Sequence, residues 1–305
     1  MGLTRYDLTI SSGSTGRIVE RMQRELVRRG EDLTVDGKCG PRTMGAVARA
    51  LCLPSPRSIG RVELARLGID VRLGIDLSGH NEGGNKRPVN FDKVKAAGVS
   101  FVWLKLTEHE SYRNHEAMRQ ADECQRLGLD LGGYHFGDPS AKRPLDLGAL
   151  KADAVAEADH YLQWRGAVIG APTLSDVLDL EEAYMAALKA AAWSALGVTS
   201  AKRAELCVRW CLAWLEHVER ATGRTPMIYT GRWSWQGFLA AAPAELLELL
   251  RRFGLWLPSY NKGAGPKRTI KGWVERVWQF SGSGQIDGVD GKVDLNWALA
   301  EDLKP

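Results

Sequence analysis

The sequence predicts an α/β protein, a closed barrel of strands and helices preceded by a small all-α domain. Apolar runs of strand length alternate with helical patterns from residue 72 to residue 257, which is the signature of parallel βα units. Two further strand patterns follow, and loops rich in Gly, Ser and Pro take the place of helices there. Residues 1–53 show only helical periodicity. The chain therefore divides into two parts with different architectures.

The first part is expected to contain two helices and a short third segment. Residues 17–29 and 44–51 carry apolar residues at helical spacing, and turn chemistry separates them. Pro54 and Pro56 then break the pattern before a short segment that is either a closing helix or a linker. We expect a three-helix domain over residues 1–70 and a barrel over residues 71–305.

The barrel is predicted from eight strands and five helices. The strands are residues 72–77, 99–106, 131–136, 174–180, 227–230, 255–257, 276–280 and 293–295. The helices lie between the first six strands, at residues 91–97, 115–127, 149–164, 204–222 and 237–252. This order describes a TIM-like barrel in which loops, and not helices, join the last three strands. Such barrels carry their active residues at the C-terminal ends of the strands.

The strand at residues 174–180 carries the candidate catalytic pair. Leu178 and Leu180 alternate with Asp179 and Glu181, so the two acids share one face of a half-buried strand. Their Cα atoms should lie roughly 6.5–7 Å apart. Hydrolysis of a glycosidic bond needs one carboxyl that donates a proton and one that stays charged beside the developing cation. An acidic strand end running into a turn is the alternative explanation of the same pattern.

Acidic and aromatic residues recur at the ends of the other predicted strands, which favours a common site. His135, beside Tyr134, and Glu108 are the members most easily explained by a structural role. The full set is Asp76, Glu108, Tyr134, His135, Asp179, Glu181, Tyr229, Tyr260, Trp278, Gln279 and Asp294.

Composition excludes several other classes of protein. A hydrophobic fraction of 44% and a net charge of +4 fit a globular chain and lie far from a nucleic-acid-binding profile. The five cysteines lack the spacing of a metal or redox motif, so we predict neither a metal nor a cofactor. No apolar run reaches membrane-spanning length, and residues 1–16 lack the apolar core of a secretory signal. We expect a monomer made in the cytoplasm without a signal peptide, and no membrane insertion.

Taken together, these segments resemble the glycoside hydrolase family 25 muramidases, the Chalaropsis-type lysozymes. The resemblance is carried by residues 74–78, 134–136, 179–181, 228–230, 278–280 and 288–296. It implies a (β/α)5β3 barrel that cleaves between N-acetylmuramic acid and N-acetylglucosamine. It also implies that Glu181 is the general acid/base, Asp179 its carboxylate partner, and Asp76 and Asp294 flanking acids. Groove residues would be Tyr134, Tyr229 and Trp278, with Tyr260, Gln279 and Glu108 as further substrate-binding candidates.

The N-terminal part resembles the type 1 peptidoglycan-binding domain. The matching residues are Gly13, Gly16, Val19, Gln23, Leu26, Gly30, Val35, Asp36, Gly37, Gly40, Thr43, Ala46 and Val47. This resemblance implies bacterial peptidoglycan as the partner. Combined with the missing signal, it is similar to phage endolysins, which act on the cell wall after release from the host cytoplasm.

Several alternatives remain at this stage. The barrel could be a catalytically inactive wall-binding protein, a bacterial autolysin with the same chemistry, or an enzyme acting on chitin. A zinc amidase or a Cys/His peptidase is disfavoured because the barrel strands carry no suitable motif. For the hydrolase, both direct inversion by water and assistance from the substrate's own N-acetyl oxygen fit the sequence.

Overall fold

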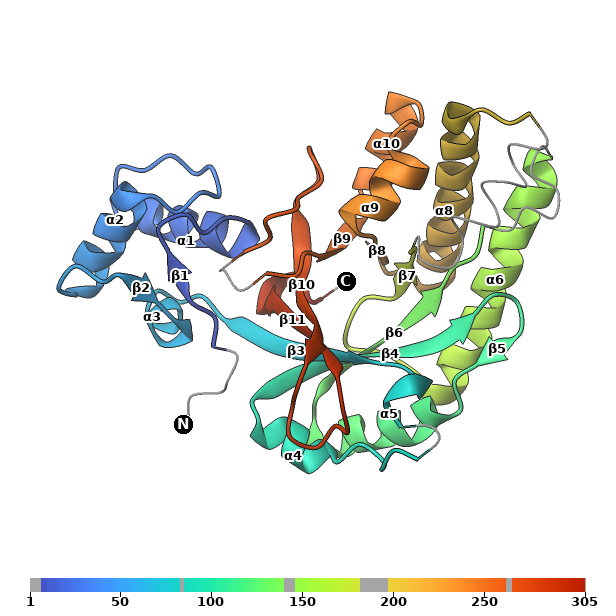
Figure 1. Cartoon of the computed structure of the whole chain (residues 1–305), viewed down its shortest axis with the longest axis horizontal. Helices are drawn as coiled ribbons and strands as arrows, with labels where there is room; N and C mark the ends of the chain where they lie inside the picture. Colours follow the sequence, from blue (N-terminus) through green and yellow to red (C-terminus); the bar gives the residue numbers. More distant parts are fainter. Residues whose placement is uncertain (1–6, 83–84, 140–145, 182–196, 262–264, 305) are drawn as a thin grey trace.

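A computed structural model describes residues 7–82, 85–139, 146–181, 197–261 and 265–304. The chain forms an N-terminal unit (residues 7–70) that lies beside a larger barrel (Figure 1). β3 begins at Val71, directly after that unit. No helix in the described segments is long and apolar enough to cross a membrane.

The N-terminal unit contains three helices and a small β ladder. The helices are α1 (Arg17–Arg28), α2 (Pro41–Leu51) and α3 (Arg61–Arg66). The ladder, which the sequence did not predict, joins β1 (Ile10–Ser11) to β2 (Ser58–Ile59) in antiparallel register. Strands of two residues are too short to show a period of two, which explains why the pattern misses them.

Buried Gln23 ties this unit together, because its amide bridges the turn between α1 and α2. The Nε2 atom donates to Asp36 Oδ1 and to the Lys38 carbonyl, both at 3.0 Å. The Oε1 atom accepts the backbone N–H groups of Asp36 and Gly37 at 3.1 and 2.8 Å. Gln23, one of the residues that match the peptidoglycan-binding pattern, therefore stabilises the local fold.

The predicted closed barrel is confirmed. Its strands run in the order β3-β11-β10-β9-β8-β7-β6-β4, and the pairing of β3 with β4 closes the ring. β11 is antiparallel to both of its neighbours, and the other pairs in the ring are parallel. A short β5 (Tyr112–Arg113) extends the sheet beside β4. The ring strands are β3 (Val71–Leu77), β4 (Val99–Glu108), β6 (Asp130–Phe136), β7 (Val177–Asp179), β8 (Met227–Tyr229), β9 (Gly254–Pro258), β10 (Glu275–Gly284) and β11 (Val293–Leu299).

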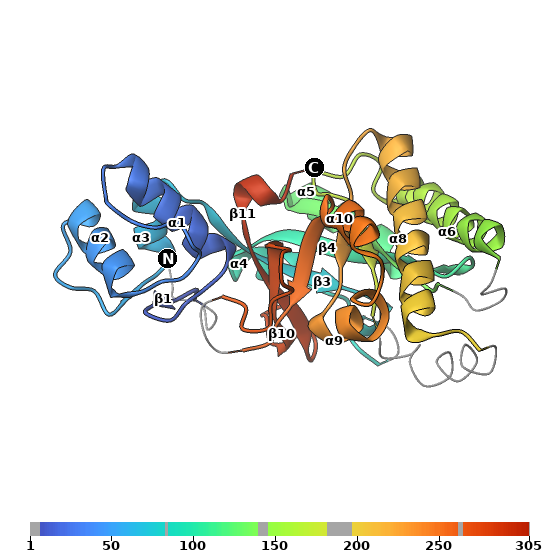
Figure 2. The same cartoon turned by 90° about the horizontal axis from the view of Figure 1, so that it is seen from above.

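Helices cover the strands from β3 to β9, as Figures 1 and 2 show. They are α4 (Phe91–Ala96), α5 (Glu116–Leu127), α6 (Leu147–Val168), α8 (Ser200–Thr222), α9 (Arg232–Ser234) and α10 (Ala244–Arg251). Short turns of helix, η1 (Gly79–Asn81), η2 (Trp235–Leu239) and η3 (Ala300–Asp302), complete the described elements.

Two of the differences between the predicted and observed elements have a clear physical reason. The single helix expected at residues 237–252 is interrupted, and α10 begins only after Pro243, which has no N–H to continue a helix. The strand expected from residue 174 begins at Val177. The Ser175 carbonyl accepts the Trp103 indole N–H at 3.0 Å, so it is used by a side chain and not by the sheet.

The barrel interior is filled by large side chains below the strand ends. Phe101, Trp103 and Trp256 belong to a buried cluster inside the ring, and the Trp103 and Trp256 ring centroids are 4.7 Å apart. Gly74 makes room for this cluster, since a Cβ there would lie 1.9 Å from the Phe101 ring. Because this packing closes the interior, a substrate can reach only the end of the barrel above it.

Candidate active site

An acidic pocket lies at the C-terminal ends of the barrel strands. Its volume is about 50 Å³, room for a few water molecules or a small substrate group. The lining residues are Asp76, Tyr134, Asp179, Glu181, Tyr229, Trp256, Gln279 and Asp294. Seven of these eight were candidates from the sequence, and they come from six different strands or strand ends.

Asp179 and Glu181 form the pair at the end of β7. Leu180, between them, points to the outer core, and its N–H donates to the Tyr229 carbonyl at 2.9 Å. Burial raises the pKa of Asp179 well above its usual range, and the charge of Glu181 raises it further. Burial, followed by the charge of Asp294, also raises the pKa of Glu181. Burial and crowding of the carboxyls therefore both favour the protonated form.

A second acidic pair, Asp76 and Asp294, faces this one. They are direct partners in the antiparallel pairing of β3 with β11, and a hydrogen bond joins their carboxyls. Asp76 Oδ2 also accepts the Gln279 and Asn296 amides at 3.0 and 2.8 Å. Burial and the neighbouring Asp294 charge raise the pKa of Asp76 well above normal, although both amide donors oppose that shift. Two carboxyls this close are coupled, and one proton held between them relieves their repulsion.

Gln279 connects this pair to two tyrosines. Its Oε1 accepts the hydroxyls of Tyr229 and Tyr260 at 2.9 and 2.8 Å. Tyr229 is buried on β8, whereas Tyr260 is 59% exposed and lies at the rim. Burial raises the pKa of Tyr134 and of Tyr229, so both remain neutral phenols at the pocket wall.

Three functional positions were missed by the sequence interpretation: Lys105, Trp256 and Asn296. Lys105 lies 4.5 Å above the Phe136 ring, and its charge lowers the pKa of both Asp179 and Glu181. Trp256 lines the pocket and donates from its indole to Asn296 Oδ1 at 2.8 Å. Strand alternation could have found Lys105, which follows the inward-facing Phe101 and Trp103 at a spacing of two.

Four candidates do not line the pocket: Tyr260 at the rim, Trp278, Glu108 and His135. Trp278 was expected in the groove, but it sits on the outer face of β10, 4% exposed, against Leu8 and Ile10 of the N-terminal unit. Neighbouring residues of a strand point to opposite faces, so Trp278 cannot share the pocket with Gln279. Glu108 pairs with Lys105 at 2.5 Å and does not line the pocket.

His135 also faces outward. Its ring nitrogens contact Thr107 Oγ1 and Glu157 Oε2, both at 2.8 Å, and its ring stacks on Trp214. This arrangement is a buried structural network. In the described residues, no three His, Cys, Asp or Glu side chains are arranged to hold a metal ion.

The barrel and its acidic pocket define a class. Paired carboxyls with raised pKa values at the strand ends of such a barrel are the apparatus of a glycoside hydrolase. The profile described as "Glycosyl hydrolases family 25" matches residues 75–289. The chain belongs to this family, and it is a glycoside hydrolase.

Known proteins agree with this assignment. Lysozyme M1 of Streptomyces globisporus is 27% identical over 251 residues, which cover 80% of this chain and 71% of that protein. The N,O-diacetylmuramidase of Chalaropsis sp is 28% identical over 230 residues, covering 72% of this chain and 95% of that protein. Among solved structures, the spore cortex lytic enzyme SleM of Clostridium perfringens matches with a TM-score of 0.60 at 27% identity, covering 77% of this chain and 70% of that chain.

Proposed function

We propose that this chain is a muramidase that hydrolyses the β-1,4 bond between N-acetylmuramic acid and N-acetylglucosamine in peptidoglycan. The observation that carries the proposal is the Asp179–Glu181 pair, buried among two further acids at the strand ends of a family 25 barrel. A pure wall-binding protein gains nothing from crowding four carboxyls in one pocket, because the crowding costs stability.

In the first step, Glu181 donates its proton to the glycosidic oxygen as the bond to the leaving sugar breaks. The raised pKa of Glu181 extends the pH range over which that proton is available. Positive charge develops on the sugar ring, and the ionised carboxyls of the pocket stabilise it. Tyr134 and Tyr229 supply uncharged walls that exclude water.

Two routes complete the reaction. Asp179 Oδ1 is buried without a hydrogen-bond donor among the described residues, so it can accept the N–H of a substrate acetamido group. That contact would orient the acetamido oxygen for attack on the sugar and lead to retention of configuration. Direct attack by water would instead invert the configuration. NMR of the first-formed anomer distinguishes the two routes.

We also propose that the N-terminal unit binds peptidoglycan and that the protein acts as a phage endolysin, reaching the wall after release from the cytoplasm. Support comes from the resemblance of residues 13–47 to a peptidoglycan-binding domain. The full chain carrying Glu181→Gln, which cannot digest its target, should sediment with purified sacculi. Binding that disappears at moderate salt would point to simple attraction of a chain with net charge +4.

Mass spectrometry of digested peptidoglycan tests the reaction itself. We expect new reducing ends on N-acetylmuramic acid, with the peptide stems intact. New N-acetylglucosamine ends, cleaved stems or an undigested wall would contradict the proposal. Chitin oligomers, incubated in parallel, test the alternative substrate that shares the N-acetylglucosamine unit.

A further inference from the structure

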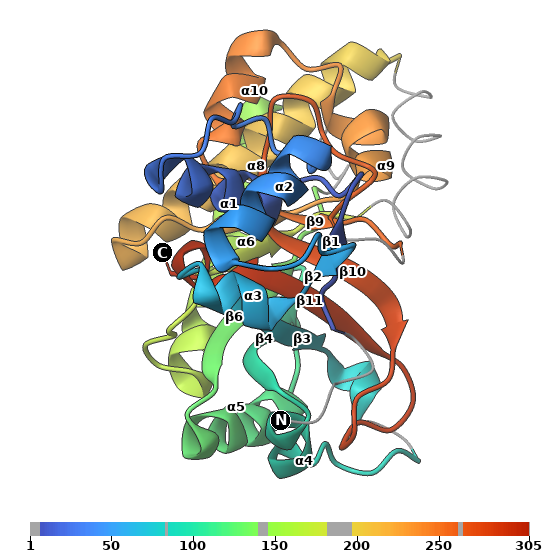
Figure 3. The same cartoon turned by 90° about the vertical axis from the view of Figure 1, so that its left-hand side faces the viewer.

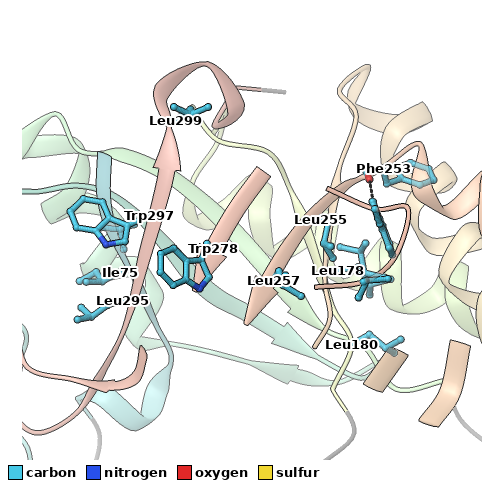
Figure 4. Packing of buried hydrophobic residues seen from close by; sticks show 14 of the residues in the cluster. Ile75, Leu178, Leu180, Phe253, Leu255, Leu257, Trp278, Leu295, Trp297 and Leu299 are labelled. Atoms are coloured by element: carbon cyan, nitrogen blue, oxygen red, sulfur yellow. Dashed lines mark hydrogen bonds between the residues drawn. The ribbon is translucent and has the colours of Figure 1, made fainter. Parts of the chain in front are cut away.

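The β10–β11 hairpin has one face in the active site and the other beneath the N-terminal unit. Two adjacent cross-strand pairs show this: Trp278 is paired with Trp297, and Gln279 with Asn296. Gln279 and Asn296 point inward and hold Asp76. Trp278 and Trp297 point outward, and Figure 4 shows their indoles on neighbouring strands.

The N-terminal unit covers the outward pair closely. Leu8, Ile10 and Ile18 meet the two tryptophans around a void of about 10 Å³, no larger than one water molecule. Arg61 of α3 lies 5.4 Å from the centre of the Trp297 ring. Figure 3 shows the N-terminal helices in front of β10 and β11. Tight packing of this kind transmits a displacement across the sheet.

Polar contacts join the start of α1 to both strands at the open end of the same hairpin. The Arg17 N–H donates to Glu275 Oε1 at 2.9 Å, at the start of β10. The Arg17 guanidinium makes two bonds of 3.0 Å to Asp302, just after β11. Gly16 permits this approach, since it has a φ of +104° and a Cβ there would lie 2.5 Å from Glu275 Oε1.

We propose that the N-terminal unit positions the catalytic acids by clamping the β10–β11 hairpin, with Trp278 and Trp297 as positioning residues for Asp76. Packing of the outward tryptophans against the N-terminal unit fixes the position of the hairpin. The inward Gln279 and Asn296 on that hairpin in turn fix the position of the Asp76 carboxyl. The unit is then part of the catalytic architecture in addition to any role in wall binding. This inference rests on the proposed hydrolase function for its kinetic consequences only.

Loosening the clamp should change the titration of Asp76 in a defined direction. The Gln279 and Asn296 amides stabilise the ionised form and lower the pKa of Asp76. If the hairpin moves away, the pKa of Asp76 rises. Asp76 then takes up its proton at a higher pH when the solution is acidified. The other titratable groups around Asp76 are Asp294 on β11, Tyr134 on β6, Asp179 and Glu181 at the end of β7, Tyr229 on β8 and Tyr260 at the rim.

The test compares Trp297→Ala with Trp273→Ala in the full chain. Both indoles are buried to a similar extent, 3% and 5% exposed, but Trp273 packs on Trp235 and bonds the Phe253 carbonyl, away from Gln279 and Asn296. Carbon-13 NMR of labelled aspartates follows the Asp76–Asp294 titration whether or not the chain is active. Trp297→Ala should move it to higher pH, in the same direction as Asn296→Ala, whereas Trp273→Ala should not.

Kinetics on soluble muropeptide oligomers provides the second readout. Misplacement of the acids should lower kcat/KM about 10- to 100-fold in Trp297→Ala. Trp297→Phe, which retains an aromatic ring, should recover most of the loss. If Trp297→Ala does not fold, Arg17→Ala replaces it, because Arg17 is at the surface of the interface. A wild-type aspartate titration in both Trp297→Ala and Arg17→Ala would overturn the clamp, whereas an inactive wild-type enzyme would instead refute the proposed reaction.

Discussion

Two of the regions that bury carboxyls surround them in opposite ways. At the interface between the N-terminal unit and the barrel, Asp302 is matched by the Arg17 guanidinium. In the pocket, Asp76, Asp179, Glu181 and Asp294 face one another, and among the described residues Lys105 is the cation whose charge acts on both members of the catalytic pair. Burial next to a cation stabilises an ionised carboxyl, whereas burial next to other carboxyls stabilises a protonated one. The Arg17–Asp302 pair joins the N-terminal unit to the barrel, whereas the cluster of pocket carboxyls favours a protonated acid that can take part in catalysis.

The largest expected effect is that of Glu181→Gln, which removes the proton donor from the pocket and leaves its volume nearly unchanged. Release of reducing ends from peptidoglycan should fall by at least about 100-fold, the lower end for general acid catalysis. Glu245→Gln on exposed α10 is the matched control and should keep wild-type activity. Near-normal turnover of Glu181→Gln would eliminate this residue as the acid.

A smaller effect is expected for Lys105→Met. Lys105 lowers the pKa of Asp179 and of Glu181, so its loss lets the pair hold its proton to higher pH. The alkaline limb of the rate profile should therefore move upward, while the rate at neutral pH changes about tenfold or less. Glu108→Gln, which keeps the cation but removes its partner, separates the charge of Lys105 from its orientation. A downward shift in Lys105→Met would contradict the electrostatic explanation.

At the interface, Arg17→Ala should change the stability of the protein more than it changes the rate of the reaction. Loss of two charged hydrogen bonds to a buried carboxylate should lower the free energy of unfolding by about 1–3 kcal/mol. Urea denaturation measures this change. Arg24→Ala, which removes an exposed pair with Glu20 on the same helix, should cost about 0.5 kcal/mol or less. Equal losses in the two variants would show that the interface pair is no stronger than a surface pair.

The sequence predicted this fold well because its signals are periodic. Alternation places Tyr134, Asp179 and Tyr229 on inward faces, and the structure confirms each of these positions. Alternation also shows why Trp278 was misplaced, since it is adjacent to Gln279 and must face outward. A residue's role at an interface depends on what packs against it, and no local pattern reports that the N-terminal unit covers β10.

Some site features depend on register that the sequence does not encode locally. Asp76 and Asp294 become partners because β11 closes the barrel beside β3, more than 200 residues later in the chain. Asn296 was missed for the same reason, since its importance comes from its contacts with Asp76 and Trp256. Lys105, in contrast, could have been found by counting inward positions along β4.

We expect repulsion among the pocket carboxyls to help keep the catalytic proton on Glu181, and the pH profile of Asp179→Asn measures this contribution. The charge of Glu181 raises the pKa of Asp179, whereas burial and then the charge of Asp294 raise the pKa of Glu181. Because an ionised neighbour raises the pKa of a carboxyl, we expect a neutral Asn at position 179 to lower the pKa of Glu181. Glu181 would then lose its proton at a lower pH, and the alkaline limb of kcat/KM on soluble muropeptide oligomers should move downward. An alkaline limb that stays in place would contradict this expectation and leave burial and the charge of Asp294 as the causes of the raised pKa.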